Sequence, residues 1–301
     1  MNAVTPLTED TVPQLVIDQG VATITLNRPA HRNRLHNDDL RALMAHFEQI
    51  NRDTTTRVVV LTGAVRPERP VFCAGYHIGQ HGEEYDDARF EHVADALENL
   101  RPVTICALNG SVYGGATDFV LACDQAVGVA GIEMRMPAAA LGMHYYPGGL
   151  SRYVSRLGVT NAKRAFLGAE TFLAEELLRI GYVQELVPAV ALQVAVRRRV
   201  DALLALAPLA LESLKRSLNE LGRGEHDDVR LRQRQIDSQA TRDFAEACSA
   251  FAERRGKELR RGVSVVGPHR DGLGFVADGV DRGEIVLRRR PLILSGAFTD
   301  K

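Results

Sequence analysis

The sequence predicts an α/β protein whose parallel strands alternate with helices and are followed by a helical C-terminal part. Short apolar runs such as VVVLTG, which ends at Gly63, and VTICALNG, which follows Pro102, are typical of strands buried on both faces. Between such runs, apolar residues recur at helical spacing, and from Ser151 to Arg261 the patterns are mainly helical. This order indicates strand–helix–strand units layered with helices.

The first predicted elements are a pair of strands and a helix. QLVIDQGVATITLNRP indicates two strands joined by a turn at residues 18–20, and Pro29 ends the second strand. Asn37 is a suitable N-cap for a helix. The apolar residues after it recur at helical spacing, at Leu40, Leu43, Met44, Phe47 and Ile50.

The next elements alternate, and the chain then changes character. VFCAG ends a strand, residues near 86–100 form a charged helical stretch, GGATDFVLACD indicates a helix, and QAVGVA indicates a strand. We expect a β/α core at residues 10–200, a helical region at 201–261, and a tail at 262–301 to which the sequence assigns no structure.

Composition and charge exclude several classes of partner. The chain of 301 residues is 45% hydrophobic and 25% charged, which is ordinary for a globular protein, and its formal net charge of −1 implies no general attraction to polyanions. The basic runs at 197–199 and 288–290 are interpreted as solvated faces, because no nucleic-acid motif accompanies them. No apolar run approaches the roughly 20 residues of a membrane span, so we expect neither a nucleic-acid nor a membrane partner.

Cysteine usage and the N-terminal sequence favour a cytoplasmic protein. The four cysteines form no CxxC pair and lie mostly in apolar runs, as expected of reduced, buried thiols. The N-terminal MNAVTPLTEDT is polar and lacks the apolar segment of a signal peptide.

Two glycine-containing corners carry the candidate chemistry. In FCAGYHIG, Gly75 permits a tight turn before Tyr76, and in NGSVYGGATDFV the pair Gly114 and Gly115 precedes a helix. The first N–H groups of a helix have no intrahelical acceptor. We predict that the backbone N–H groups of Tyr76 and Gly115 converge as an oxyanion hole, with the Tyr76 ring beside the substrate. The alternative is that each cluster is only a turn or a close packing contact.

The chain resembles the crotonase (enoyl-CoA hydratase/isomerase) superfamily over about residues 10–260. The resemblance rests on ITLNRPAHRNRL, VVVLTG, VFCAGYHI and GSVYGGATDFVLACD, with support from PAAALGMHYYPGGLSRYVSRLG and AFAERR. It implies a spiral of ββα units, a helical C-terminal trimerisation region, and a homotrimer or a dimer of trimers. It also implies a bent coenzyme A thioester whose enolate is stabilised in the oxyanion hole, with no cofactor beyond the coenzyme A of the substrate.

The resemblance places the substrate among residues from four stretches of the chain. The CoA head group would lie near residues 28–34 and near the protein backbone at residues 74–78. The implied substrate and CoA contacts are Arg28, Arg32, Arg34, Ala74, His77, Ile78, Gly114, Ala138, His144 and Tyr146.

Departures from the family pattern bear on the reaction. Family hydratases carry two glutamates that share one water; here the first position is Asp118 and the second is Ala138, which has no acid/base chemistry. A further position, which is an aspartate in some isomerases and dehalogenases, is Tyr146. Arg34 stands where the family usually has a small residue, which would alter the CoA entrance.

Asp118 and Tyr145 are the two candidate catalytic side chains. Asp118 either complements the dipole of its helix or acts as a general acid/base, for which the motif position argues. Tyr145 resembles the tyrosine of acyl-CoA decarboxylases in the family, which also lack the second glutamate. Tyr145 or His144 would then orient the leaving CO2 or protonate the enolate; the alternative is that HYY is only pocket wall.

Three functions follow from these residues. The first is a hydratase/isomerase reaction on an enoyl-CoA with Asp118 as the acid/base; the second is decarboxylation of the methylmalonyl-CoA type, or C–C cleavage, using Tyr145. The third is a non-catalytic acyl-CoA-binding homologue. A metal site is not expected, because His77 and His81 have i, i+4 spacing in a glycine-containing segment without a third ligand.

Overall fold

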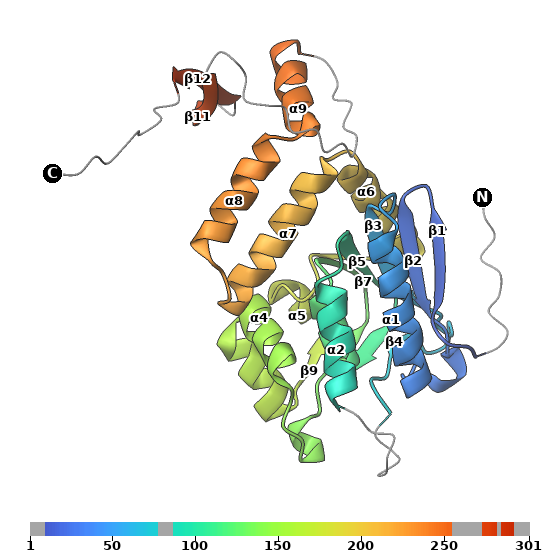
Figure 1. Ribbon diagram of the computed structural model, residues 1–301. Coiled ribbons are helices and arrows are strands. Elements are labelled where there is room, and N and C mark those ends of the chain that lie inside the picture. Colours follow the sequence, from blue (N-terminus) through green and yellow to red (C-terminus); the bar gives the residue numbers. More distant parts are fainter. Residues whose placement is uncertain (1–9, 78–86, 255–272, 282–283, 292–301) are drawn as a thin grey trace. The chain divides into compact units, whose positions relative to one another are not determined.

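A computed structural model describes residues 10–77, 87–254, 273–281 and 284–291 (Figure 1). Its contacts divide the chain into two units, Met1–Arg234 and Gln235–Lys301. The boundary lies inside the segment 201–261 that we expected to be one helical region, and each unit is described separately below.

The first unit contains a six-stranded sheet in the order β1-β2-β3-β5-β7-β10. β1 and β2 form the predicted antiparallel pair around the turn at residues 18–20, and each later pair of neighbours in the sheet is parallel. Every residue of β5 is buried, as its continuous apolar sequence predicts. The strands are β1 Gln14–Asp18, β2 Val21–Leu26, β3 Val58–Gly63, β5 Val103–Leu108, β7 Gln125–Val129 and β10 Glu185–Val187.

A second sheet has the order β4-β6-β8-β9 and consists of three-residue strands. β4, β6 and β8 pair in parallel, and β9 pairs with β8 in the antiparallel direction. These strands are β4 Val71–Cys73, β6 Ser111–Tyr113, β8 Glu133–Arg135 and β9 Thr171–Leu173. The sequence analysis recognised β4 but not the other three, because three residues are too few to show a period.

The order of elements produces the predicted ββα repeat. One strand of the large sheet is followed by one strand of the small sheet and then by a helix, three times in succession: β3-β4-α2, β5-β6-α3 and β7-β8-α4. The helices are α2 Asp87–Glu98, α3 Ala116–Ala122 and α4 Pro147–Gly168, in which Gly158 has non-helical dihedral angles. Each repeat therefore adds one strand to the large sheet and one strand to the small sheet, next to the strands of the preceding repeat.

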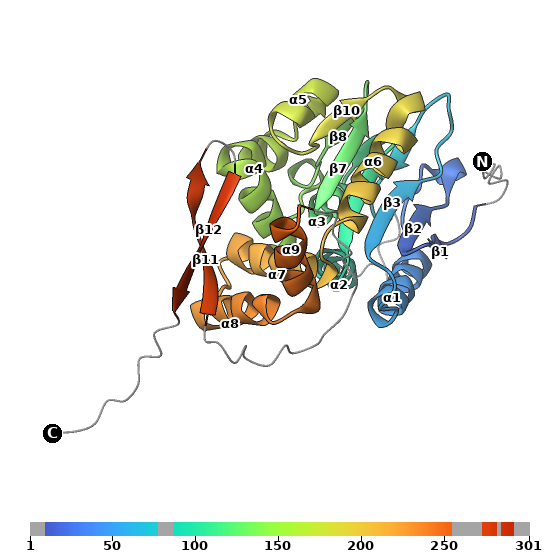
Figure 2. The same ribbon diagram turned by 90° about the horizontal axis from the view of Figure 1, so that it is seen from above.

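Helices cover the large sheet on both faces. α1, α2, α3 and α4 pack in series, each against the next, whereas α6 packs on β3, β5 and β7 (Figures 1 and 2). The remaining helices of this unit are α1 Asn37–Arg52, α5 Ala174–Arg179, α6 Leu192–Leu204 and α7 Pro208–Arg223, and α8 Asp228–Gln239 crosses the boundary between the units. Short 3-10 turns lie at Pro29–His31, Ala139–Leu141 and Ala189–Ala191.

The N-cap of α1 differs from the prediction. His36, not Asn37, is the N-cap, and Asn37 is the first residue of the helix. The Asp39 carboxylate accepts a hydrogen bond from the His36 backbone N–H at 2.7 Å, which satisfies a group that the start of the helix would otherwise leave without a partner. The predicted N-cap, Asn37, therefore lies one residue after the observed N-cap, His36.

The second unit contains α9 and a two-stranded sheet. α9 spans Arg242–Ala252, and the Thr241 hydroxyl accepts a hydrogen bond from the Phe244 N–H as its N-cap. β11 (Leu273–Asp281) and β12 (Glu284–Pro291) pair in the antiparallel direction. These strands fall in the tail to which the sequence assigned no structure.

Candidate active site

The loop after β4 and the loop after β6 come into backbone contact. Gly75 has φ +92°, and a Cβ atom added there would lie 2.9 Å from the Tyr113 carbonyl oxygen and 3.3 Å from the Gly115 nitrogen. A side chain at residue 75 would therefore be strained and would also separate the loops. The two glycine corners, 39 to 40 residues apart in sequence, lie together because β4 and β6 are neighbours in the small sheet.

The second corner is fixed by packing from α2. Gly114 has φ +57°, and a Cβ atom added to Gly115 would lie 2.8 Å from the Phe90 ring. Gly115 is the N-cap of α3, where backbone N–H groups lack intrahelical acceptors. Glycine is therefore required at both residues, at Gly114 for its dihedral angles and at Gly115 for the space beside Phe90.

A cavity of about 340 Å³ lies at this junction and gathers most of the predicted site residues. Four side chains that the sequence analysis did not single out, Phe90, Met136, Leu141 and Met143, make part of its wall apolar. The predicted residues that line it are Arg34, Ala74, Tyr76, His77, Gly114, Gly115, Ala138, Tyr145 and Tyr146.

Asp118 lies behind this cavity and not in its wall. Its side chain has an exposed fraction of 0%, and the Arg152 guanidinium holds it through Nε–Oδ1 at 2.9 Å and Nη2–Oδ2 at 2.6 Å. The Tyr146 hydroxyl donates to Oδ2 at 2.7 Å. Asp118, one of the two predicted catalytic side chains, therefore does not line the cavity, and its two carboxylate oxygens are occupied by a buried cation and a phenol.

Tyr145 and Tyr146 connect the cavity to this carboxylate. Both line the cavity, and the Tyr145 hydroxyl donates to the Tyr146 hydroxyl at 2.9 Å. Burial, and then the negative charge of Asp118, raise the pKa of each phenol well above its ordinary value. Both hydroxyls are therefore protonated at neutral pH and form a continuous chain of donors that ends on Asp118.

Arg152 is the residue at this site that the sequence analysis missed. Its side chain is 1% exposed, and beyond Asp118 it contacts Asp95 at 2.7 Å and Glu98 at 3.2 Å. Burial opposes its charge, but the hydrogen bonds with Asp118 and Asp95 outweigh that effect and raise the pKa of the guanidinium. No sequence signal marks it, because its three carboxylate partners are 34 to 57 residues away along the chain.

The predicted CoA contacts are only partly at the cavity. Arg28 holds the buried Asp39 carboxylate at the start of α1, Arg32 is exposed, and His144 is exposed with its ring bonded to the Tyr145 carbonyl. None of these three lines the cavity in the described part of the chain. Arg28 is held by Asp39 and His144 by the Tyr145 carbonyl, and both side chains lie outside the cavity wall.

Ile78 and His81 lie outside the described residues, so neither the CoA contact of Ile78 nor the His77–His81 pair is tested here.

Arg34 and His77 form the polar edge of the cavity. They lie on two segments that are joined by backbone hydrogen bonds, because the Leu35 N–H donates to the Gly75 carbonyl and the His77 N–H donates to the Leu35 carbonyl, both at 2.9 Å. The buried Nε of Arg34 has no hydrogen-bond partner among the described residues.

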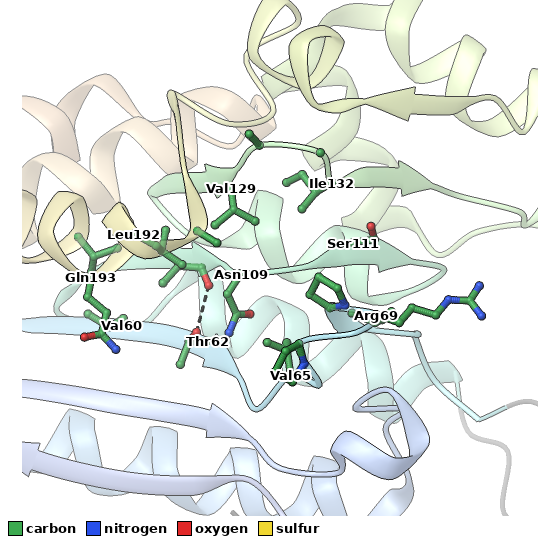
Figure 3. A pocket seen from close by; sticks show the side chains of 18 of the residues that line it. Val60, Thr62, Val65, Arg69, Asn109, Ser111, Val129, Ile132, Leu192 and Gln193 are labelled. Carbon is green, nitrogen blue, oxygen red and sulfur yellow. Dashed lines mark hydrogen bonds between the residues drawn. The ribbon is translucent and has the colours of Figure 1, made fainter. Parts of the chain in front are cut away.

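A second and larger cavity, of about 970 Å³, lies between the large sheet, α6 and the loops before β4 and β8 (Figure 3). Figure 3 shows Val60 and Thr62 of β3 facing Leu192 and Gln193 of α6, with the Thr62 hydroxyl donating to the Ala107 carbonyl. Tyr113 lines both cavities. None of the predicted site residues in the described ranges lines the larger one, so its size alone does not make it the reactive centre.

No helix in the described part of the chain is long and apolar enough to cross a membrane.

Comparisons with known proteins find relatives both in sequence and in structure. A family model described as enoyl-CoA hydratase/isomerase matches residues 16–260. The short-chain-enoyl-CoA hydratase of Clostridium acetobutylicum is 29% identical over 78% of this chain and 92% of its own length. The 2,3-dehydroadipyl-CoA hydratase of Escherichia coli is 29% identical over 80% of this chain and 96% of its own. A crystal structure of enoyl-CoA hydratase from Bacillus anthracis has 25% identity and a TM-score of 0.73, covering 83% of this chain and 99% of that chain.

Proposed function

Since this chain belongs to the enoyl-CoA hydratase/isomerase family, we propose that it binds an enoyl-CoA thioester in the 340 Å³ cavity and stabilises the thioester enolate there. The observation that carries the proposal is the backbone contact between Gly75 and the Gly114–Gly115 corner at that cavity. The N–H groups of Tyr76 and Gly115 would donate to the thioester oxygen. One such donor is worth about 10²–10³ in rate.

The side chains at the rim and wall divide the remaining tasks. Arg34 and His77 line the cavity and would contact the coenzyme A portion, since its phosphates are anionic and a guanidinium binds phosphate well. Tyr145 lines the cavity and would exchange the proton at the reacting carbon, while Asp118 supplies negative charge from behind. No cofactor is required in this scheme, because the electron pair moves only within the thioester.

A turnover screen tests this function. The full chain is incubated with crotonyl-CoA, longer 2-enoyl-CoAs, a 3-enoyl-CoA and methylmalonyl-CoA, and products are identified by mass spectrometry and absorbance. We expect a gain of water or a shifted double bond. Loss of CO2 from methylmalonyl-CoA, with the enoyl-CoAs untouched, would replace the proposal by decarboxylation, which the names of the compared relatives do not favour.

A matched pair of variants tests the role of Tyr145. Tyr145→Phe removes the hydroxyl at the cavity, and general acid/base catalysis typically contributes about 10²–10⁴ in rate. Tyr153→Phe is the control, because that phenol is also buried but donates to the Thr117 hydroxyl at 2.6 Å, and Tyr153 does not line the cavity. Equal losses in both variants would assign Tyr145 to the wall alone.

The chain is further proposed to assemble as a homotrimer or a dimer of trimers. α7 supports this, because Leu214, Leu218 and Leu221 form a stripe at helical spacing and are 59%, 64% and 45% exposed. Native mass spectrometry of the wild type and of Leu218→Asp tests the assembly. A monomeric wild type at micromolar concentration would refute it.

A further inference from the structure

We infer that Tyr145, Tyr146 and Asp118 form a proton relay positioned by Arg152, and that the relay serves double-bond isomerisation of a 3-enoyl-CoA rather than hydration of a 2-enoyl-CoA. The inference rests on the proposed function, since it requires an enoyl-CoA whose enolate is stabilised in the same cavity. It assigns the direction of proton movement, the positioning residue and the substrate class.

The relay is continuous in geometry. Tyr145 donates to Tyr146 at 2.9 Å and Tyr146 donates to Asp118 Oδ2 at 2.7 Å, so each link has the length of a good hydrogen bond. Both tyrosines line the cavity and Asp118 does not. The chain therefore leads from the cavity wall to a carboxylate with no exposed surface, and a proton taken at the wall has a defined acceptor.

Arg152 fixes the acceptor end of the relay. Its bidentate contact leaves the carboxylate little freedom to turn, so Oδ2 stays directed at the Tyr146 hydroxyl. Asp95 and Glu98 hold the same guanidinium through Nη1, at 2.7 and 3.2 Å. Among the described residues, Arg152 does not line the cavity and makes no hydrogen bond to Tyr145 or Tyr146. It is therefore a positioning residue.

The part of the cavity wall around Ala138 disfavours a nucleophilic water. Hydration needs a water held beside the reacting carbon, and an ordered water needs two to four polar partners. The segment around Ala138 instead contributes Met136, Pro137, Leu141 and Met143. None of the residues that line the cavity in the described ranges is an aspartate or a glutamate. Isomerisation moves only a proton between two carbons and needs no such water.

The step balances without a co-reactant. The C2–H bond of the 3-enoyl-CoA breaks, and its proton passes to Tyr145 as the Tyr145 proton passes to Tyr146 and the Tyr146 proton to Asp118. The electron pair enters a dienolate whose oxygen carries the negative charge. The reverse transfer then delivers the Tyr145 proton to C4, the double bond forms between C2 and C3, and Asp118 is again ionised.

The experiment compares two substrates of equal length in the full chain. With 3-hexenoyl-CoA we expect 2-hexenoyl-CoA, which has the same mass and a new conjugated absorbance. With 2-hexenoyl-CoA we expect addition of water, measured by mass, to be at least about ten times slower. Hydration that equals or exceeds isomerisation would overturn the assignment of the reaction. Turnover of neither substrate would overturn both this inference and the proposed function.

Three variants test the relay separately. Tyr146→Phe keeps the ring and breaks the chain, so kcat should fall about 100-fold or more while KM changes less than about threefold. The kcat of Asp118→Asn should fall by a similar factor, and Asp118→Glu should recover part of that loss in kcat. Arg152→Lys keeps the charge but not the bidentate geometry and should lower kcat by an intermediate factor.

Two results would overturn the relay while leaving the proposed function intact. One is a wild type that isomerises the substrate together with a Tyr146→Phe variant whose kcat is within threefold of it. The other is a loss of the same size in Tyr153→Phe, the control outside the cavity, because a purely structural effect would lower both. Unfolding midpoints measured for every variant show whether the kinetic losses come from folded protein.

Discussion

The two sides of the cavity are built by different means. The proposed oxyanion side consists of backbone groups at Gly75, Tyr76, Gly114 and Gly115, and the two glycine corners lie together at the cavity. The proposed acid/base side consists of side chains, and there Asp118 lies behind Tyr146 and is held by Arg152. A backbone donor follows from the local turn, whereas a side-chain charge is placed by partners from distant elements.

The largest expected effect is on stability, at the side-chain side. Arg152→Leu would leave the Asp118 carboxylate buried without its cation, which typically costs about 3–5 kcal/mol. Urea unfolding of the full chain measures the loss. Arg179→Leu, which breaks an exposed ion pair with Glu176, should change the unfolding midpoint little. Similar small changes in both variants would mean that the buried network is not a stabilising feature of the native state.

The next effect is on activity, at the backbone side. Gly75→Ala places a Cβ atom 2.9 Å from the Tyr113 carbonyl and displaces the oxyanion corner, so kcat/KM should fall by about 10²–10³. Gly131→Ala is the control, because Gly131 has φ +80° with no atom within 4 Å of the added Cβ. Both variants carry backbone strain, and only the first should lose activity. Equal losses would remove the argument for the corner.

A gain of function would sharpen the contrast between the sides. Ala138→Glu introduces a carboxylate into the apolar wall, where Ala138 is 6% exposed. A carboxylate there would provide a partner for water, and we expect the ratio of hydration to isomerisation to rise roughly tenfold. Product ratios from 2-hexenoyl-CoA and 3-hexenoyl-CoA measure it. An unchanged ratio would show that the composition of this wall does not decide the reaction.

The smallest effect is a pH dependence of stability. Burial raises the pKa of Tyr145 and Tyr146 in the folded state, whereas in the unfolded chain their pKa is about 10. Their contribution is therefore complete below pH 10 and is lost as the pH rises above it, because the unfolded state then releases protons that the folded state keeps. Urea midpoints between pH 8 and 11 should fall less steeply in the Tyr145→Phe/Tyr146→Phe double variant than in the wild type.

The same distinction explains what was predictable in the fold. The large-sheet strands β2, β3, β5 and β7 follow from apolar runs and the helices α1 to α4 from helical spacing, whereas the ββα repeat was implied by the family resemblance. The strands β6, β8 and β9 have three residues each, and only their pairing in the small sheet defines them.

At the site, sequence alone determined which residues approach the cavity through the backbone. Gly75 and the Gly114–Gly115 pair are local requirements for positive φ or for space, whereas Ala138 and Tyr145 were assigned to the site by the family resemblance. The absence of a carboxyl group at Ala138 was likewise readable from the sequence.

Only the tertiary structure decided what Asp118 does. The sequence gives its position at the start of α3, but its two oxygens are occupied by Tyr146 and Arg152, which are 28 and 34 residues further along the chain. Such a charge is stable in the interior only where several partners from different elements converge on it, and no local pattern records that convergence.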